Sequence, residues 1–359
     1  MKISVVGLRG FPHVQGGIET HCEALYSHLA KTSLSITVYG RKKYRVKDSD
    51  ESKIKTIWLP CFYSQYFETI SYMIFCVLHI LFNKKPNIVH VHGIGPALFS
   101  PLFRLMGLKV VLTYHTADYE RKKWGFFAKK VLKVGESIGF KFANKIIALS
   151  EGSKNRLASL FLAFAEKIVV IPNGVELPLQ KNNGHGKFIL AMGRFEDGKG
   201  FDDLLDALHL VEATSVGCQV DAIIAGKPDH ENAYSRNLVK KRRSCVKFPG
   251  FVQGEAKEKL FLECGLFVTP SHHEGLPFVL LEAMSYSCRI LASDIPAHKE
   301  LGLPDECYFP CKDIAVLAEK IEKFYLCHSD PVNYDEILKK RFNWETVAKQ
   351  TFDLYGSIL

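Results

Sequence analysis

The chain has 359 residues, which is enough for two domains of ordinary size, each with its own hydrophobic core. Its hydrophobic fraction of 47% and its charged fraction of 24% are those of a soluble globular protein. Residues 1–172 hold 25 Lys and Arg against 11 Asp and Glu, a balance of +14, which leaves 22 against 27, a balance of −5, for the rest. This asymmetry predicts different partners for the two halves.

Export, membrane crossing and disulfide bonding are not indicated. After Met1 and Lys2 the apolar run ends at Val6, which is too short for a secretory signal. The longest apolar stretch, residues 70–82, falls short of the roughly twenty residues that span a bilayer, and its helical spacing predicts a buried or interfacial helix. The ten cysteines are scattered without a Cys-x-x-Cys pair, which predicts reduced thiols and no zinc site. We therefore expect a cytoplasmic protein.

Short apolar runs alternate with helical patterns along both halves of the chain. In the first half the runs predict strands at residues 3–6, 36–39, 88–91, 110–113, 145–148 and 168–171. Helical patterns between them include residues 19–31 and 126–143. In the second half, strands are predicted at 188–191, 221–225, 266–269 and 289–292, and a helix at 201–210. Such alternation predicts two doubly wound parallel sheets, each of the Rossmann-like α/β class.

The predicted domain boundary lies near the middle of the chain. A polar, glycine-rich segment at residues 180–186 is typical of a linker. We expect an N-terminal domain over 1–172, a linker over 173–186 and a C-terminal domain over 187–345. A last helix, at about 346–359, is expected to pack back on the N-terminal domain.

A glycine-rich segment, residues 7–17, follows the first strand and precedes a helix. The pair Gly16 and Gly17 would let the backbone approach a phosphate at a helix N-terminus. The segment departs from Gly-x-Gly-x-x-Gly, and no acidic residue ends the second strand, so binding of a nicotinamide dinucleotide is disfavoured. A flexible turn remains the structural alternative.

Three histidines lie at predicted strand ends. His90 and His92 are alternate residues of one strand and face the same side, and His115 closes the next strand. The carboxyl ends of such strands point into the ligand crevice of an open α/β sheet. A metal site is one interpretation, although no carboxylate companion is evident. A buried, hydrogen-bonded imidazole is the other, and we favour it for His90.

Two segments of the second half carry charges suited to a phosphorylated, hydroxyl-bearing ligand. Arg194 and Lys199 lie in a glycine-rich segment after the first strand of this half, where a guanidinium and an ammonium can neutralise phosphate oxygens. Glu274 and Glu282 flank a predicted helix start at Pro277, and carboxylates accept hydrogen bonds from hydroxyls. The first N–H groups of a helix have no acceptor within it, which predicts an anion site at Leu276, Phe278 and Val279.

The segment 271–285 resembles the donor-site motif of the retaining family 4 glycosyltransferases, in which two Glu are separated by seven residues. The resemblance recurs at Gly16-Gly17, at 88–93, at 171–175, at 193–200 and at Trp344, so it covers nearly the whole chain in the expected order. It implies the GT-B fold, two Rossmann-like domains with a cleft between them. It also implies a retaining, hexosyltransferase-type transfer from a nucleotide-diphosphate sugar by front-face displacement, without a metal.

The resemblance assigns a role to each matching residue. His92 and Glu274 would line the reacting sugar as catalytic residues, and Glu282 would bind the ribose. The donor sugar and the helix N-terminus would meet at Gly275, Leu276 and Phe278, and the diphosphate would contact Gly16, Gly17, Arg194 and Lys199. His115 is a weaker candidate for the acceptor side.

The resemblance also indicates substrate and partners. Members of this size commonly build bacterial surface polysaccharides on lipid-linked saccharide acceptors, so we expect such an acceptor. Two other activities stay open: a different GT-B sugar-nucleotide enzyme, such as an epimerase or hydrolase, and a non-catalytic nucleotide-sugar binding subunit.

The segment 121–145 carries eight Lys and Arg. On a helical wheel Lys122, Lys129 and Lys133 cluster opposite an apolar stripe that consists of Trp124, Phe127, Val131, Val134 and Ile138. An ordinary surface helix with its lysines outward is one interpretation. The other is a face that contacts anionic lipid headgroups, which would make the protein peripheral on the inner face of the cell membrane. Nucleic acid is not expected, because the aromatic side chains point away from the lysines.

Overall fold

The computed structural model describes residues 1–12, 14, 16–45, 54–64, 67–83, 85–120, 124–186, 188–214, 220–228, 231, 233–241, 244–326 and 332–359. It divides into two compact units, each described by itself below. The first comprises Met1–Gly174 and Arg341–Leu359, and the second comprises Val175–Lys340.

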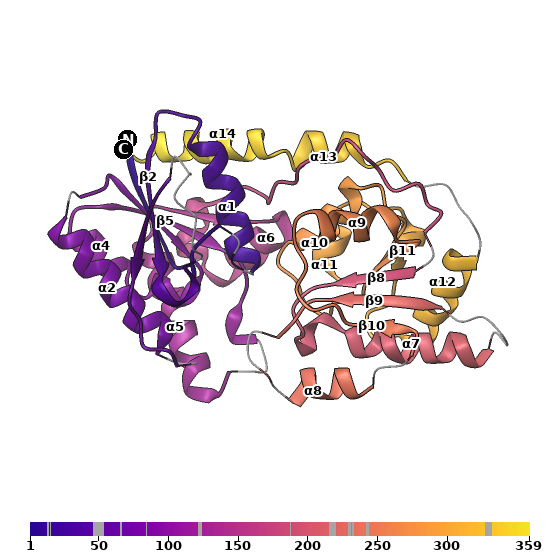
Figure 1. The fold of residues 1–359 in the computed structure, drawn as a ribbon. Helices are drawn as coiled ribbons and strands as arrows, with labels where there is room; N and C mark the ends of the chain where they lie inside the picture. The colour runs from indigo at the N-terminus through magenta and orange to yellow at the C-terminus, as the bar shows by residue number, and fades with distance from the viewer. Residues whose placement is uncertain are drawn as a thin grey trace. The chain divides into compact units, whose positions relative to one another are not determined.

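A seven-stranded parallel sheet forms the centre of the first unit (Figure 1). The order is β3-β2-β1-β4-β5-β6-β7, and the strands are β1 Lys2–Val6, β2 Ser35–Arg41, β3 Lys55–Leu59, β4 Ile88–His92, β5 Lys109–Tyr114, β6 Lys145–Ala148 and β7 Ile168–Val170. All six predicted strands are present. Sequence reasoning missed β3, because this edge strand is half-exposed and its residues Lys55-Thr-Ile-Trp-Leu59 form no continuous apolar run.

Helices cover the sheet of the first unit. They are α1 Gly17–Leu29, α2 Glu68–Phe82, α3 Ile94–Ala97, α4 Ser100–Leu105, α5 Phe126–Phe142, α6 Glu151–Leu160 and α14 Trp344–Gly356. Side chains of α2, α3, α4 and α5 share one hydrophobic core with the strands, so these helices pack on the same face. The C-terminal helix α14 packs on α1 (Figure 1).

Helix α5 packs through glycines instead of through its apolar stripe. A Cβ atom at Gly135 would lie 2.5 Å from the carbonyl oxygen of Ile94, and one at Gly139 would lie 2.7 Å from the Cβ of Ala97. Phe127, Val131 and Val134 of the stripe are exposed, Phe127 at 81%, whereas Trp124 and Ile138 are half-buried. Lys133 is exposed, as a surface helix with its lysines outward predicts, and much of the opposite stripe is exposed as well. Lys122 lies outside the described residues.

The second unit contains a six-stranded parallel sheet, ordered β10-β9-β8-β11-β12-β13. Its strands are β8 Phe188–Met192, β9 Asp221–Ala225, β10 Val246–Lys247, β11 Leu266–Thr269, β12 Ile290–Ser293 and β13 Tyr308–Phe309. Its helices are α7 Phe201–Thr214, α8 Ala233–Lys240, α9 Glu255–Glu263, α10 Phe278–Ser285, α11 Pro296–Lys299, α12 Ile314–Leu326 and α13 Asp335–Arg341. The two-residue strands β10 and β13 are too short to give a sequence signal.

Both sheets are parallel throughout, which confirms the predicted pair of doubly wound α/β domains. The eight cysteines in the described ranges are free thiols, and seven of them are buried. Among the helices that the structure describes, none is long and apolar enough to cross a membrane.

Candidate functional site

The loop between β11 and α10 carries the first predicted carboxylate. Strand β11 is fully buried, and α10 begins at Phe278, with Pro277 as its N-cap residue. Pro277 therefore precedes the first turn instead of lying in it, one position from the expectation. Gly275 and Leu276 lie in the loop directly before α10, and Phe278 is the first residue of that helix.

Glu274 is held by two side chains of the same unit. The Lys199 ammonium forms an ion pair with its Oε1, and the Ser271 hydroxyl donates to the same oxygen at 2.9 Å. Only 12% of the Glu274 side chain is exposed. Burial opposes ionisation, but the charge and hydrogen bond of Lys199 outweigh it and hold the pKa of Glu274 below its usual value. Glu274 is therefore ionised at neutral pH and accepts hydrogen bonds.

Backbone contacts bring Lys199 to this loop. The N–H of His272 donates to the Gly198 carbonyl at 2.9 Å. Gly200 has a φ of +63°, and a Cβ there would lie 2.1 Å from the Pro270 carbonyl oxygen, so a glycine is required. The His272 ring also contacts Asp203 at 2.7 Å. The two predicted segments, 193–200 and 271–285, are therefore in contact.

Arg194 lies on the same glycine-rich segment as Lys199. Its Nε is 3.1 Å from Oε1 of Glu196, and its side chain is 23% exposed. The two cations therefore reach the site differently, since Lys199 contacts Glu274 whereas Arg194 is oriented by a neighbour on its own loop. Phosphate oxygens would compete with both carboxylates for these cations.

Glu282 forms an ion pair with a residue that sequence reasoning missed. Its partner is Lys257 on α9, and about a quarter of each side chain is exposed. No spacing pattern links Lys257 to Glu282, because the contact depends on how α9 packs beside α10. Lys257 thus joins Arg194 and Lys199 as a third cationic side chain among the candidate residues.

The glycine pair lies at the start of α1 in the first unit. Gly16 is the N-cap residue, and a Cβ there would lie 1.9 Å from Oε2 of Glu19. The buried Glu19 side chain turns back over the loop, where its Oε1 accepts from the N–H of Arg9 at 3.0 Å. Gly16 is required for this turn, whereas Gly17 faces open space.

The predicted histidines form a buried hydrogen-bond network in the first unit. His92 uses both ring nitrogens: Nε2 lies 2.8 Å from the Tyr26 hydroxyl and Nδ1 lies 3.1 Å from Nε2 of His115. His90 contacts Tyr26 at 2.8 Å and Tyr355 of α14 at 2.6 Å. His90 and His92 are fully buried.

A fourth imidazole, His21 of α1, joins the network. Its ring centroid lies 5.2 Å from that of His115, and its Nδ1 is 2.9 Å from Oδ1 of Asn173. Burial lowers the pKa of His21 to about 4 and that of His90 to about 3. Burial and the neighbouring rings hold the pKa values of His92 and His115 well below the usual value. The cluster is therefore neutral at pH 7.

Sequence reasoning missed His21, Tyr26 and Tyr355 because none lies in a motif, and their contacts depend on α1 and α14. The 171–175 turn and Trp344, two other segments of the resemblance, do meet: a Cβ at Gly174 would lie 2.4 Å from the Trp344 ring. Within the described residues, no three His, Cys, Asp or Glu side chains are arranged to hold a metal ion.

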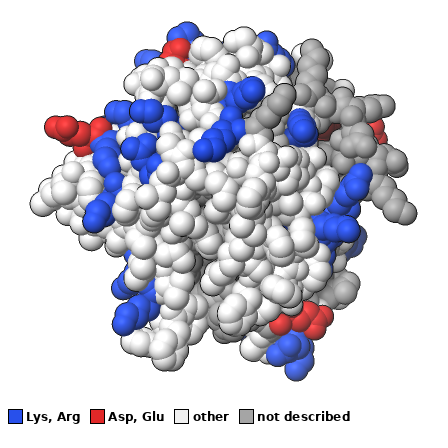
Figure 2. Space-filling model, turned by 90° about the vertical axis from the view of Figure 1, so that its left-hand side faces the viewer, with Lys and Arg blue, Asp and Glu red and all other residues white. Residues whose placement is uncertain are grey.

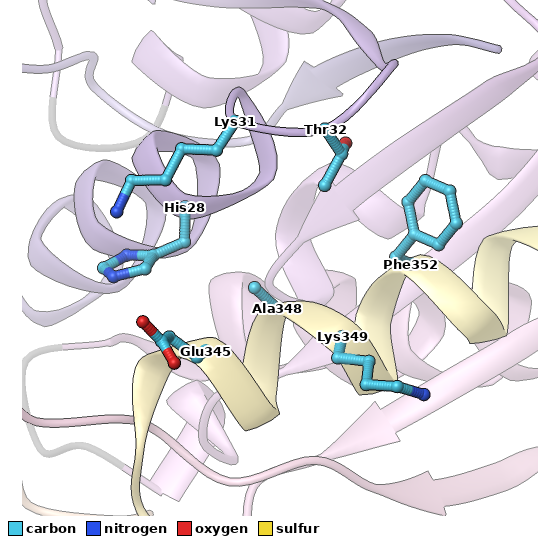
Figure 3. A pocket seen from close by; sticks show the side chains of 7 residues that line it. All are labelled: His28, Lys31, Thr32, Glu345, Ala348, Lys349 and Phe352. Carbon is cyan, nitrogen blue, oxygen red and sulfur yellow. The ribbon is translucent and has the colours of Figure 1, made fainter.

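A pocket of about 320 Å³ opens between α1 and α14 in the first unit (Figure 3). The predicted site residues do not line it. Its lining consists of His28, Lys31, Thr32, Glu345, Ala348, Lys349 and Phe352. We assign it no part in the candidate site.

Two family models match the chain in succession. Glycosyltransferase Family 4 matches residues 15–178, and Glycosyl transferases group 1 matches residues 178–341. The chain carries the two domains of a glycosyltransferase. The boundary between the two matches falls close to the division between the two units, so each unit corresponds to one glycosyltransferase domain.

Curated relatives and solved structures agree with this assignment. An uncharacterized glycosyltransferase of Methanocaldococcus jannaschii is 23% identical over 99% of this chain and 98% of its own length. The capsular polysaccharide biosynthesis glycosyltransferase CapM of Staphylococcus aureus is 24% identical over 78% of this chain and 79% of its own.

Two solved structures share the fold over almost the whole chain. Sucrose-phosphate synthase of Thermosynechococcus elongatus superposes with a TM-score of 0.79 at 19% identity, covering 99% of this chain and 98% of that one. Anabaena HepE in complex with UDP-glucose superposes with a TM-score of 0.77 at 18% identity, covering 99% of both chains. The glycosyltransferase domains of this chain therefore adopt the GT-B fold, as predicted.

Proposed function

We propose that this glycosyltransferase moves a hexose from a nucleotide-diphosphate sugar to a lipid-linked saccharide acceptor, with retention of anomeric configuration, in surface polysaccharide biosynthesis. The observations that carry the proposal are two ion pairs in the second unit, Lys199 with Glu274 and Lys257 with Glu282. These pairs offer cations for a diphosphate and carboxylates for sugar hydroxyls. HepE, a structural neighbour, binds UDP-glucose, and CapM serves capsular polysaccharide synthesis.

The two carboxylates, two of the cations and the backbone have distinct roles in the proposed reaction. Glu282 accepts from the ribose hydroxyls, and Glu274 accepts from a hydroxyl of the donor sugar. Arg194, Lys199 and the backbone at Gly16 and Gly17 neutralise the diphosphate. The sugar meets the start of α10 at Gly275, Leu276 and Phe278.

The chemical step is a front-face displacement. The acceptor oxygen bonds to the anomeric carbon on the face from which the phosphate leaves. As the carbon–oxygen bond to the phosphate breaks, the departing phosphate oxygen takes the proton of the acceptor hydroxyl. Negative charge grows on the diphosphate in the transition state, so Arg194 and Lys199 bind it more strongly there than in the ground state.

In this proposal His92 has a positioning role and transfers no proton. Both of its ring nitrogens are engaged within the unit, and its pKa is held well below neutral. A general base would need one nitrogen free to reach the acceptor hydroxyl. We infer that His92 shapes the sugar side of the first unit, while His115, which is 9% exposed, is nearer to solvent.

The anomeric configuration of the product tests the proposal. Proton NMR follows the reaction with a nucleotide-sugar that the enzyme accepts as donor. The product should have the anomeric configuration of the donor. An inverted anomer would refute retention. Release of free sugar without transfer, or epimerised donor, in reactions with acceptor would favour another GT-B enzyme. Donor binding without turnover would favour a binding subunit.

A further inference from the structure

Exposed bulky apolar side chains concentrate on one layer of the first unit. Of the twenty large apolar side chains exposed in the described ranges, thirteen lie on α2, α4, α5 or the loop that leads into α2. The most exposed are Leu105 at 84%, Phe127 at 81%, Phe82 at 79% and Phe126 at 77%. Exposed apolar groups at this density are unusual for a surface that meets only water.

The helices that carry them lie in one layer. Their inner sides share a single hydrophobic core against the same sheet face. Helix α3 contacts both α2 and α5, because a Cβ at its Gly95 would lie 3.5 Å from Leu132 of α5 and 3.9 Å from Thr69 of α2. The outer sides of α2, α4 and α5 therefore point away from the sheet in a common direction. We call this exposed surface of α2, α4 and α5 the α2–α5 face.

The charges of the α2–α5 face are of one sign. Helix α5 exposes Lys130 and Lys133, and α4 exposes Arg104. The carboxylates of these three helices are withdrawn from solvent: Glu68 pairs with Arg41 at 2.8 Å, and Glu136 is buried at 4% exposure. Figure 2, which presents the side on which α2 and α4 lie in Figure 1, shows a mostly uncharged surface with scattered Lys and Arg and a few Asp and Glu toward its edges.

We propose that the α2–α5 face docks on an anionic lipid bilayer. Phe82, Leu105 and Phe127 insert among the headgroups, while Lys130 and Lys133 pair with lipid phosphates. A second copy of this face is a poor occupant, because it would bring lysines against lysines. This inference rests on the proposed function in one respect: a lipid-linked acceptor lies in such a membrane, so docking would deliver the first unit to it.

Vesicle flotation tests the docking without donor or acceptor. The wild-type chain is mixed with vesicles of phosphatidylcholine alone or with phosphatidylglycerol, at low and high salt. We expect flotation only with the anionic vesicles, weakened by salt because the headgroup attraction is screened. Failure of the wild type to float with anionic vesicles overturns the proposal and favours a protein partner for this face.

Two variants separate insertion from charge. Phe82→Ser with Leu105→Ser and Phe127→Ser is expected to weaken partition into anionic vesicles by at least about tenfold, since three inserted side chains are lost. Lys130→Glu with Lys133→Glu is expected to weaken it by a similar factor and to lessen its salt dependence. Wild-type flotation by either variant overturns the proposal.

Matched controls use exposed residues that do not belong to α2, α4 or α5. Leu162→Ser changes an apolar side chain of the same unit that is 79% exposed. Lys259→Glu with Lys339→Glu reverses two lysines of the second unit that are 70% and 62% exposed. Both controls should float as the wild type does, and losses equal to those of the face variants would refute the assignment to this face.

Turnover with a soluble saccharide acceptor distinguishes a failure of the membrane docking from a failure of the proposed function. Both face variants should retain it, because their substitutions lie outside the candidate site. A chain that floats but consumes no nucleotide-sugar refutes the proposed function alone. A chain that turns over a soluble acceptor but never floats refutes the docking alone.

Discussion

At the scale of single residues, the carboxylate of Glu282 is the clearest test of the donor site. Glu282→Ala should weaken donor binding by roughly 1.5–3 kcal/mol, the contribution of a hydrogen bond to a charged group. Calorimetric titration of the nucleotide-sugar measures the change. Glu263→Ala is the matched control, since Glu263 is more than half exposed and pairs with Lys259 along the same helix. Equal affinities in both variants would mean that the ribose binds elsewhere.

Lys199 acts on turnover as well as on affinity. Its removal withdraws positive charge from the leaving diphosphate, so Lys199→Ala should lower kcat on the order of 10²-fold in addition to weakening binding. It also leaves Glu274 buried with an uncompensated charge, which should lower the thermal midpoint. Steady-state kinetics beside Lys241→Ala, an exposed lysine paired with Asp206, provides the check. A Lys199 variant with unchanged kcat would contradict the assigned role.

Residue spacing located these charged groups but not their partners. The interval between Glu274 and Glu282, and the glycines around Arg194 and Lys199, are properties of local sequence. Lys257 reaches Glu282 in the second unit, and Tyr26 and Tyr355 reach the histidines in the first, through tertiary packing that no local pattern encodes. The exposure of Phe127 was missed for the same reason: the wheel identified a stripe, but Gly135 and Gly139 decide which side of α5 packs.

At the scale of elements, strands β4 and β5 and helices α1 and α14 meet at the neutral histidine network. A histidine with a lowered pKa binds fewer protons when folded, so its contribution to stability is present above an unfolded pKa near 6.5 and is lost as pH falls toward its folded value. His21 and His90 set that window from about 6.5 down to about 4 and about 3.

The free energy of unfolding should therefore fall steeply below about pH 6.5, by up to about 1.4 kcal/mol per pH unit for each buried histidine. Urea midpoints measured from pH 7.5 to pH 5 follow this slope. His115→Asn should make the slope shallower, because one fewer buried imidazole takes up a proton on unfolding. A wild-type midpoint that is flat across this range would contradict the buried, neutral network.

Element prediction succeeded where apolar runs were buried on both faces of a sheet. Strands such as β8 and β11 consist largely of continuous apolar runs, as expected of buried parallel strands. The edge strand β3 and the short strands β10 and β13 lack such runs. The C-terminal helix is amphipathic and was expected near 346–359; it begins at Trp344, where Asn343 caps its first N–H groups.

At the scale of the whole molecule, charge neutralisation by side chains carries a prediction about metals. In the proposed function Arg194 and Lys199 neutralise the diphosphate, so turnover should survive a strong chelator. The assay compares initial rates with and without chelator, then after addition of Mg²⁺ or Mn²⁺. Loss of turnover that a divalent ion restores would overturn this prediction and favour the metal-site interpretation of His90, His92 and His115.

The central claim is that the second unit binds a nucleotide-sugar through Arg194, Lys199, Glu274 and Glu282. A thermal-shift panel of nucleotide-sugars, run on the wild type, Lys199→Ala and Glu282→Ala, tests it most directly. At least one nucleotide-sugar should raise the wild-type midpoint, by mass action, and should raise those of the variants far less. A panel in which no nucleotide-sugar shifts the wild type, or in which all three proteins shift alike, would contradict the account.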